Sequence, residues 1–124
     1  MRERVLVVDD EQDFAESNAF LLGLGRSFHA LGYPSHRVEE MLGDAAERLG
    51  VEGQFFTTPT SIFAAFGAQD AQRTFLVRLE PGDLHLEHLG RVQAIAEDVL
   101  DGRLTPREGL TALERSEEHT SELQ

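Results

Sequence analysis

Residues 32–39 gather several chemically active side chains in one short segment. An imidazole (His36), a guanidinium (Arg37) and a carboxylate (Glu39) follow a proline and a candidate helix cap, Ser35. Because the free N–H groups of a helix N-terminus attract anions and arginine grips carboxylates bidentately, this turn could bind an amino acid or a dicarboxylate. The alternative is structural: Glu39 complements the helix dipole, Arg37 pairs with Glu39 or a neighbour, and His36 is solvated.

Hydroxyl side chains form a second candidate group. Thr57, Thr58, Thr60 and Ser61 surround Pro59, which interrupts a strand because proline has no N–H to donate. A hydroxyl cluster at such a break can line a polar cavity. Threonine and serine are also ordinary strand and turn residues, and the pattern favours that second interpretation.

Two arginines, Arg73 and Arg78, lie toward opposite ends of one strand-like segment. Side chains an odd number of positions apart point to opposite faces of a strand. We therefore expect these guanidinium groups to make cross-strand or interdomain salt bridges rather than to grip one ligand.

The histidines do not define a metal centre. Zinc takes three or four ligands that converge. His85 and His88 are three positions apart, but nothing in the sequence brings them together with His29 and His36. We expect solvated histidines, no metal site and no cofactor.

A stand-alone soluble hydrolase is the enzyme alternative. Ser35, His36 and Asp44, or Ser61 with a histidine, have the residue types of a catalytic triad. Neither serine lies in a G-x-S-x-G turn. The prediction is therefore that the chain is not an enzyme and has no catalytic residues.

The first residues resemble a different kind of site. Residues 4–11 read Arg-Val-Leu-Val-Val-Asp-Asp-Glu, like the first strand and acidic pair of a response-regulator receiver, where carboxylates hold Mg²⁺. A receiver also needs a lysine and a phospho-acceptor aspartate, but the chain has no lysine and residues 52–56 hold no aspartate. We expect residues 1–13 to form an extended arm, and a receiver fragment is the least favoured function.

The composition excludes several classes of function. The chain has 124 residues, 40% of them hydrophobic, and a formal net charge of −12, so it fits one domain that nucleic acids and anionic lipids would repel. The absence of cysteine excludes disulfides and thiolate chemistry. The best apolar run, residues 62–66, is far shorter than the about 20 residues of a membrane span. With no visible signal peptide, we expect a soluble chain.

Apolar periodicity predicts two helices in the first half of the chain. The first would be capped by Asp13 or Ser17 and would end near residue 31, and the second would span residues 36–49 with Ser35 as its cap and Gly50 as its stop. The predicted apolar stripe of the first helix comprises Phe14, Leu21, Leu24, Phe28 and Leu31.

Strand-like segments follow at residues 54–58, 61–66 and 73–79. Short connections make such strands antiparallel neighbours. Asp83 would then cap a third helix that ends at residues 101–102, and the spacing of Thr105 and Glu108, with proline between them, predicts a capping box for a short fourth helix. The fold class expected is α+β, with helices flanking a small antiparallel three-stranded sheet.

In this order, the blocks at residues 32–39, 57–61 and 78–83 resemble the N-terminal soluble domain of the threonine/serine exporter family of membrane transporters. The resemblance runs from about Phe20 to Leu113 and divides the chain into an arm (1–13), an exporter-like domain (14–114) and a tail (115–124). The matching positions are Gly32, Pro34, Ser35, His36, Arg37, Glu39, Thr58, Pro59, Thr60, Ser61, Arg78 and Asp83.

The resemblance implies a multi-span inner-membrane exporter of small amino acids, driven by the membrane potential or a proton gradient; some relatives are tied to dicarboxylate export. This chain would be its soluble, cytoplasmic domain, which regulates, gates or assembles the transporter. Its partners would be the transmembrane domain of the same protein, a small amino-acid or dicarboxylate ligand and, as a further candidate, a second copy. The residues implied in binding or gating are Ser35, His36, Arg37, Glu39, Thr58, Thr60, Ser61 and Arg78.

The tail has a separate explanation. Residues 115–124 read RSEEHTSELQ and match the in-frame translation of a common sequencing adapter. We expect this tail to be an artefact and the true protein to continue past Glu114 into membrane spans.

Overall fold

The computed structural model describes the backbone of residues 2–67, 72–79 and 86–123, and the side chains of residues 14–116 within those ranges. Helices enclose one small sheet in this part of the chain. The elements in chain order are α1 (Arg2–Ala30), α2 (Ser35–Leu49), β1 (Gly53–Thr58), β2 (Ser61–Phe66), β3 (Arg73–Arg78), α3 (Leu86–Leu100) and α4 (Pro106–Leu123).

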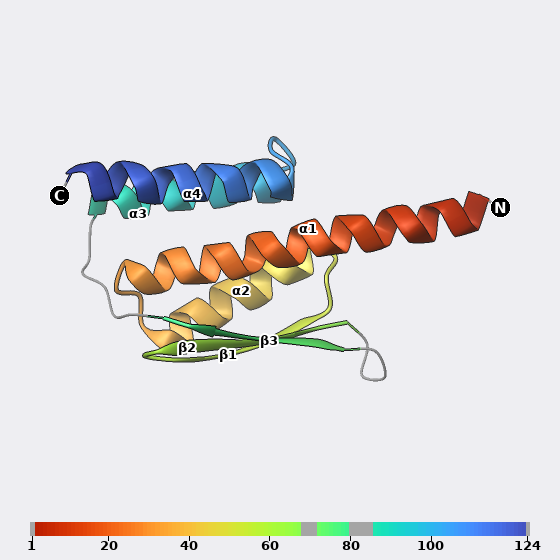
Figure 1. The fold of residues 1–124 in the computed structure, drawn as a ribbon, viewed down its shortest axis with the longest axis horizontal. Helices are drawn as coiled ribbons and strands as arrows, with labels where there is room; N and C mark the ends of the chain where they lie inside the picture. The colour runs from red at the N-terminus through yellow and green to blue at the C-terminus, as the bar shows by residue number, and fades with distance from the viewer. Residues whose placement is uncertain (1, 68–71, 80–85, 124) are drawn as a thin grey trace.

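Helix α1 is the centre of the molecule. It lies between two layers, one formed by α3 and α4 and the other by α2 and the sheet (Figure 1). A helix contacted on both sides cannot have a single apolar stripe. Accordingly Phe20, Leu21, Leu24 and Phe28 are all buried, and together they form the middle of the core.

Two glycines of α1 allow close packing on its two sides. A Cβ atom on Gly23 would lie 2.7 Å from Leu110 Cδ1 of α4, and one on Gly25 would lie 2.9 Å from both Ile62 Cδ1 of β2 and Leu42 Cδ1 of α2. Side chains at these positions would push the neighbouring elements away. The glycines that weaken the helix pattern in the sequence are therefore places where other elements approach α1.

The N-terminal part of α1 corrects two expectations. Residues 2–13 are helical, so the prediction of an extended arm is wrong, and so is that of a helix starting at Asp13 or Ser17. Extension of an existing helix costs little once its nucleus is formed, and the packed turns around Phe20 supply that nucleus. Phe14, which was expected in the apolar stripe, is 44% exposed, because α1 extends past the other elements at this end (Figure 1).

The C-terminal end of helix α2 matches its prediction. Val38, Leu42, Ala45 and Ala46 form its buried side. Gly50 ends the helix with φ 75°, and the N–H of Val51 returns to the carbonyl of Ala46 at 2.9 Å. This left-handed glycine closes the helix as expected and directs the chain into β1.

The three strands form an antiparallel meander in the order β1-β2-β3. Ile62, Ala64 and Phe66 of β2 are buried, and the residues between them are not. The buried face, which we call the inner face, lies under α1 and α2 (Figure 1). The opposite face, which we call the outer face, has no element over it among the described residues.

The last two helices pack against the far side of α1. Thr105 and Glu108 form the predicted capping box: the Thr105 N–H donates to Glu108 Oε1 at 2.9 Å, and the Glu108 N–H donates to Thr105 Oγ1 at 3.1 Å. Helix α4 then continues to Leu123, which is longer than the short helix expected. The predicted cap of α3, Asp83, lies outside the described residues.

The predicted fold class is confirmed. The described elements are four helices and a three-stranded antiparallel sheet, which make a mixed α+β fold. Its consequence for the site is geometric, because α2 lies over the end of β1 and brings residues 35–39 to the β1–β2 turn.

Candidate functional site

The start of α2 differs from its prediction. Pro34 is the N-cap, with φ −61° and ψ 147°, and no side chain caps the helix. The carbonyl of Pro34 accepts the N–H groups of Arg37 and Val38 at 3.0 and 3.1 Å. Ser35 is therefore the first helical residue rather than the cap, because proline already supplies the extended backbone that a cap position needs. The helix also begins one residue earlier than expected.

Glu39 consequently lies in the second turn of α2, and its carboxylate is held by the sheet. Glu39 Oε2 accepts the Thr57 N–H at 2.9 Å and lies 3.2 Å from the Thr57 hydroxyl. The same hydroxyl donates to the carbonyl of Ser35 at 2.8 Å. We call this three-residue contact the α2–β1 tie. It satisfies a backbone N–H of β1 that faces away from β2, and it fixes the start of α2 on the sheet.

Thr57 belongs to the hydroxyl group noted in the sequence but not to the eight residues implied in binding or gating, although it is central to the tie. Its side chain is only 5% exposed. The sequence held a signal for this position. Thr57 and Thr58 are consecutive residues of one strand, and consecutive side chains point to opposite faces, so one of the two threonines had to face the helices. A buried hydroxyl must find an acceptor, and Glu39 and Ser35 provide two.

His36 and Arg37 are exposed at the same helix start. Arg37 Nη1 lies 3.5 Å from Glu40 Oε2, so the guanidinium pairs with its neighbour on the next turn and not with Glu39. Such an exposed pair contributes little stability. These two side chains therefore remain accessible to a ligand or a partner.

The predicted hydroxyl group at the β1–β2 turn is mostly bonded within itself. Thr58 Oγ1 and Ser61 Oγ lie 2.7 Å apart, and the Thr60 N–H donates to Thr58 Oγ1 at 3.3 Å. The carbonyl of Thr60 accepts the N–H of Leu79 at 2.7 Å. These bonds close the turn, which favours the structural interpretation of this block.

The register settles where the arginines lie. Arg78 is opposite Ser61, on the outer face, whereas Arg73 is opposite Phe66, on the inner face. The prediction that they point to different faces is confirmed. Because Thr58 and Ser61 share the outer face with Arg78, the sheet separates this group from Ser35, His36, Arg37 and Glu39, and the structure does not join the eight residues into one pocket.

Surface hollows occur away from these residues. One is lined by Gly43 and Glu47 of α2 and by Glu52 and Gly53 at the start of β1. Another lies on the exposed side of α4, between Arg107 and Arg115. Neither is lined by a residue of the predicted site.

The histidines are placed differently from the expectation. His29 and His88 are buried, each 7% exposed, and only His36 among the described ones fits the solvated interpretation. His85 lies outside the described residues. Within residues 14–67, 72–79 and 86–116, whose side chains the structure describes, no three histidine, aspartate or glutamate side chains gather in a way that could hold a metal ion.

The hydrolase arrangement is not assembled. Ser35 and Asp44 belong to one helix and are separated by about 13 Å along its axis at 1.5 Å per residue. Ser61 Oγ is bonded to Thr58 rather than to a histidine. The receiver alternative also lacks its first strand, because residues 2–13 are helical.

No helix in the described part of the chain combines the length and the apolar character that crossing a membrane requires.

Similar proteins identify the chain. The family described as "Putative threonine/serine exporter" matches residues 19–123. Curated relatives include the "Uncharacterized protein C7D4.12c" of Schizosaccharomyces pombe, 31% identical over 82% of this chain, and the "Pheromone-regulated membrane protein 10" of Saccharomyces cerevisiae, 30% identical over 83% of it. The chain spans only 14% of the length of either relative. No solved structure matches it.

The family match contains all the positions that carry the sequence resemblance, from Gly32 to Asp83. It also covers the elements from the buried middle of α1 to the end of α4. The chain belongs to the threonine/serine exporter family.

Proposed function

We propose that this chain is an N-terminal domain of an exporter of threonine, serine or related small amino acids, and that it regulates or gates transport from outside the membrane. Its partner is the transmembrane part of the same protein, with an inner-membrane location for the whole and a cytoplasmic one for this domain. Family membership supports the exporter assignment. The family is named for export rather than for catalysis, which supports a non-enzymatic role.

The surface chemistry supports an aqueous location for the domain. Arg48 of α2 reaches across to α3, where its Nη2 lies 3.0 Å from Asp101 Oδ1 and 3.3 Å from the carbonyl of Leu100. Asp98 and Arg103 form another exposed pair at 3.2 Å. Such charged groups need water around them. Arg48 and Asp98 lie on helices of the two layers that enclose α1, and Asp101 and Arg103 lie in the loop after α3.

The α2–β1 tie is the observation that carries the gating proposal. In the tie, the buried Thr57 bonds to Glu39 and to Ser35. His36 and Arg37, whose side chains are accessible, lie between those two residues on α2. A carboxylate ligand or a partner loop that binds His36 and Arg37 would change the position of α2 on the sheet. That movement is the signal that we assign to the domain.

The experiment compares two adjacent glutamates in the complete exporter. Glu39→Ala removes the tie, whereas Glu40→Ala removes only the exposed contact with Arg37. Efflux of labelled threonine and serine is measured from cells with equal amounts of each protein in the membrane. We expect Glu39→Ala to change the efflux rate severalfold and Glu40→Ala to leave it unchanged.

Two results would contradict different parts of the proposal. A complete wild-type protein that exports neither threonine nor serine would overturn the exporter assignment for these solutes. A wild-type protein that exports them, with equal rates for Glu39→Ala and Glu40→Ala, would overturn the gating role of the tie and leave the exporter assignment standing.

The interpretation of residues 115–124 as an adapter artefact stays a prediction. It matters for the proposal because the transmembrane part would then follow Glu114. In the structure α4 continues through residues 115–123 as helix. Long reads of the gene past the codon for Glu114 should show a continuing frame with several apolar runs of about 20 residues. A stop codon directly after Gln124 would contradict both the tail and the transporter predictions.

A further inference from the structure

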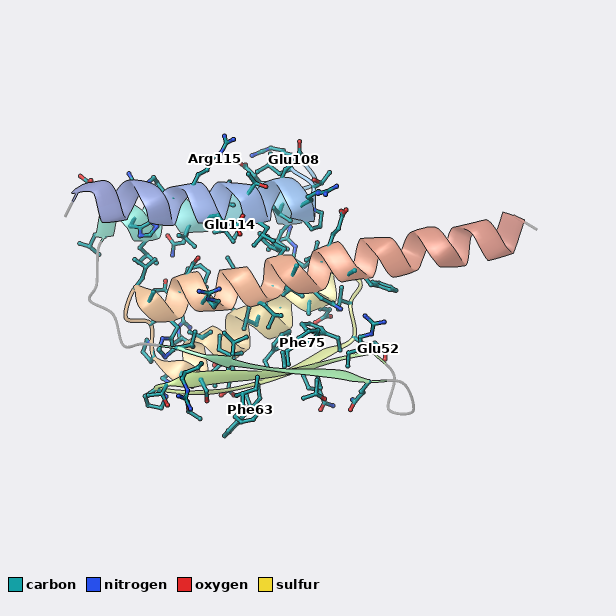
Figure 2. All side chains as sticks on the ribbon, viewed as in Figure 1. Glu52, Phe63, Phe75, Glu108, Glu114 and Arg115 are labelled. Carbon is teal, nitrogen blue, oxygen red and sulfur yellow. The ribbon has the colours of Figure 1, made fainter. Side chains whose placement is uncertain are left out.

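The outer face of the sheet carries an uncovered apolar row. Phe56, Phe63 and Leu76 lie opposite one another on the three strands and are 59%, 41% and 64% exposed. The rings of Phe56 and Phe63 are in contact, with centroids 6.1 Å apart. Figure 2 shows Phe63 pointing away from the helices, whereas Phe75 points toward them. The row is therefore separate from the core.

No acidic side chain lies on this face within the three strands. The chain has 23 aspartates and glutamates in 124 residues, so an acid-free face is unusual for it. Two further cross-strand rows complete the face: Gln54, Ala65 and Thr74 on one side, and Thr58, Ser61 and Arg78 on the other. Arg78 is the one charged residue among them.

These features fit a second copy of the same chain. Elsewhere two copies with a formal charge of −12 repel each other, but the outer faces bring no carboxylates together. The apolar row is the middle one of the three rows, so a two-fold axis between two stacked sheets places the two apolar rows on each other and Phe63 on Phe63. If this axis runs parallel to the strands, Arg78 faces Thr58 of the second copy. If it runs perpendicular to the strands, within the plane between the sheets, Arg78 faces Thr74 of the second copy. In neither case do the two Arg78 side chains meet.

The size of the face sets the strength of the contact. Three strands of six residues, spaced about 4.8 Å apart with a rise of about 3.4 Å per residue, cover roughly 300 Å². A stable complex buries about 800 Å² on each partner. The contact is therefore a weak, reversible one that needs a high local concentration, such as two transporters side by side in a membrane provide.

We propose that the outer face is a homodimer interface, in which the sheets of two copies stack face to face through Phe56, Phe63 and Leu76. Aligned stacking of two sheets is a common packing, and isologous two-fold contacts are the commonest symmetry among oligomers. The inference concerns assembly, and it does not depend on the solute or on the gating role proposed above.

The test uses the whole 124-residue chain in sedimentation equilibrium from micromolar to millimolar concentration. We expect the average mass to rise from 13.8 kDa toward twice that value. Leu76→Glu places a carboxylate on both faces of the dimer and should raise its dissociation constant about tenfold or more. Phe63→Thr, which keeps a strand-forming residue, should also raise it.

The matched control is Leu86→Glu on α3. Leu86 is 73% exposed and belongs to α3, a helix on the opposite side of α1 from the sheet (Figure 1), so the same substitution there should leave the dissociation constant unchanged. Added sodium chloride should lower that constant, because it screens the repulsion between two acidic copies.

Several results would overturn the proposal. One is a wild-type chain that stays at 13.8 kDa up to millimolar concentration; if that monomer also sediments with phosphatidylglycerol vesicles, the face belongs to a lipid surface. Another is an equal effect of Leu86→Glu and Leu76→Glu. A dissociation constant that rises with salt would also contradict it, since the contact would then be ionic.

Discussion

Neighbouring residues of β2 lie in opposite environments. Ile62 and Ala64 are buried, whereas Phe63 between them is 41% exposed. On the inner face the ring of Phe66 contacts those of Phe55 and Phe75, and on the outer face the rings of Phe56 and Phe63 are in a similar contact. Both faces are thus aromatic, and the difference comes from α1 and α2, which cover only one of them. An apolar residue in a strand therefore does not by itself reveal which face of the sheet is buried. That depends on which face the helices cover.

The largest expected effect separates the two faces directly. Ile62→Ala removes a fully buried side chain that packs near Gly25 of α1 and should lower the free energy of unfolding by about 3 kcal/mol. Phe63→Thr on the outer face should cost less than about 1 kcal/mol. Urea unfolding at micromolar concentration measures both. Equal losses would mean that the outer face is part of the monomer's core.

The next effect tests how closely the inner face meets α1. Gly25→Ala places a methyl group within 2.9 Å of Ile62 and Leu42 and should destabilise the protein by about 2 kcal/mol. Gly43→Ala is the control, because a methyl group there meets no atom within 4 Å, and it should stabilise α2 by about 0.5–1 kcal/mol. If Gly25→Ala were also stabilising, α1 would not approach the sheet as closely as described.

A smaller effect is expected at the α2–β1 tie. Thr57→Val keeps the shape of the side chain but removes the hydroxyl that donates to the carbonyl of Ser35 at 2.8 Å, which should cost about 1–2 kcal/mol. Thr74→Val, on an exposed position of β3, should change stability by less than about 0.5 kcal/mol. Thermal unfolding of the two variants in parallel distinguishes a buried bond from a surface hydroxyl.

The smallest effect concerns the exposed start of α2. Arg37→Ala loses only an exposed 3.5 Å pair with Glu40, so stability should change by less than about 0.5 kcal/mol. If His36 and Arg37 bind carboxylates, threonine, serine or succinate should raise the melting temperature of the wild type and not of Arg37→Ala. No shift in the wild type would end the ligand-site prediction.

Local signals predicted much of the fold. The apolar periodicity of residues 36–49, the capping box at Thr105 and Glu108, and the three strand-like segments are each recognisable within a few residues, and all three are confirmed. Long-range contacts were beyond these signals. Nothing near Phe14 shows that α1 extends past its neighbours, and nothing near His29 or His88 shows that they are buried.

The candidate site was predicted only in part. The sequence singled out the start of α2 and the β1–β2 turn, and the tie between Glu39 and Thr57 joins the start of α2 to the end of β1. That these segments bind a ligand stays a prediction. The hydrogen-bond partners were not predicted: Glu39 accepts from Thr57 of β1 and Arg37 pairs with Glu40, because side chains two positions apart on a helix do not face each other. Such choices depend on the exact register of a helix against a sheet, which the spacing of residues does not fix.

The most direct test of the whole account is efflux by the complete exporter with and without this domain. Cells loaded with labelled threonine would express either the complete protein or one lacking residues 14–114, at equal membrane levels. We predict export by the complete protein and an efflux rate changed severalfold when the domain is removed. Identical rates for the two proteins would contradict the regulatory role, and no export by either would contradict the assignment of threonine as the solute.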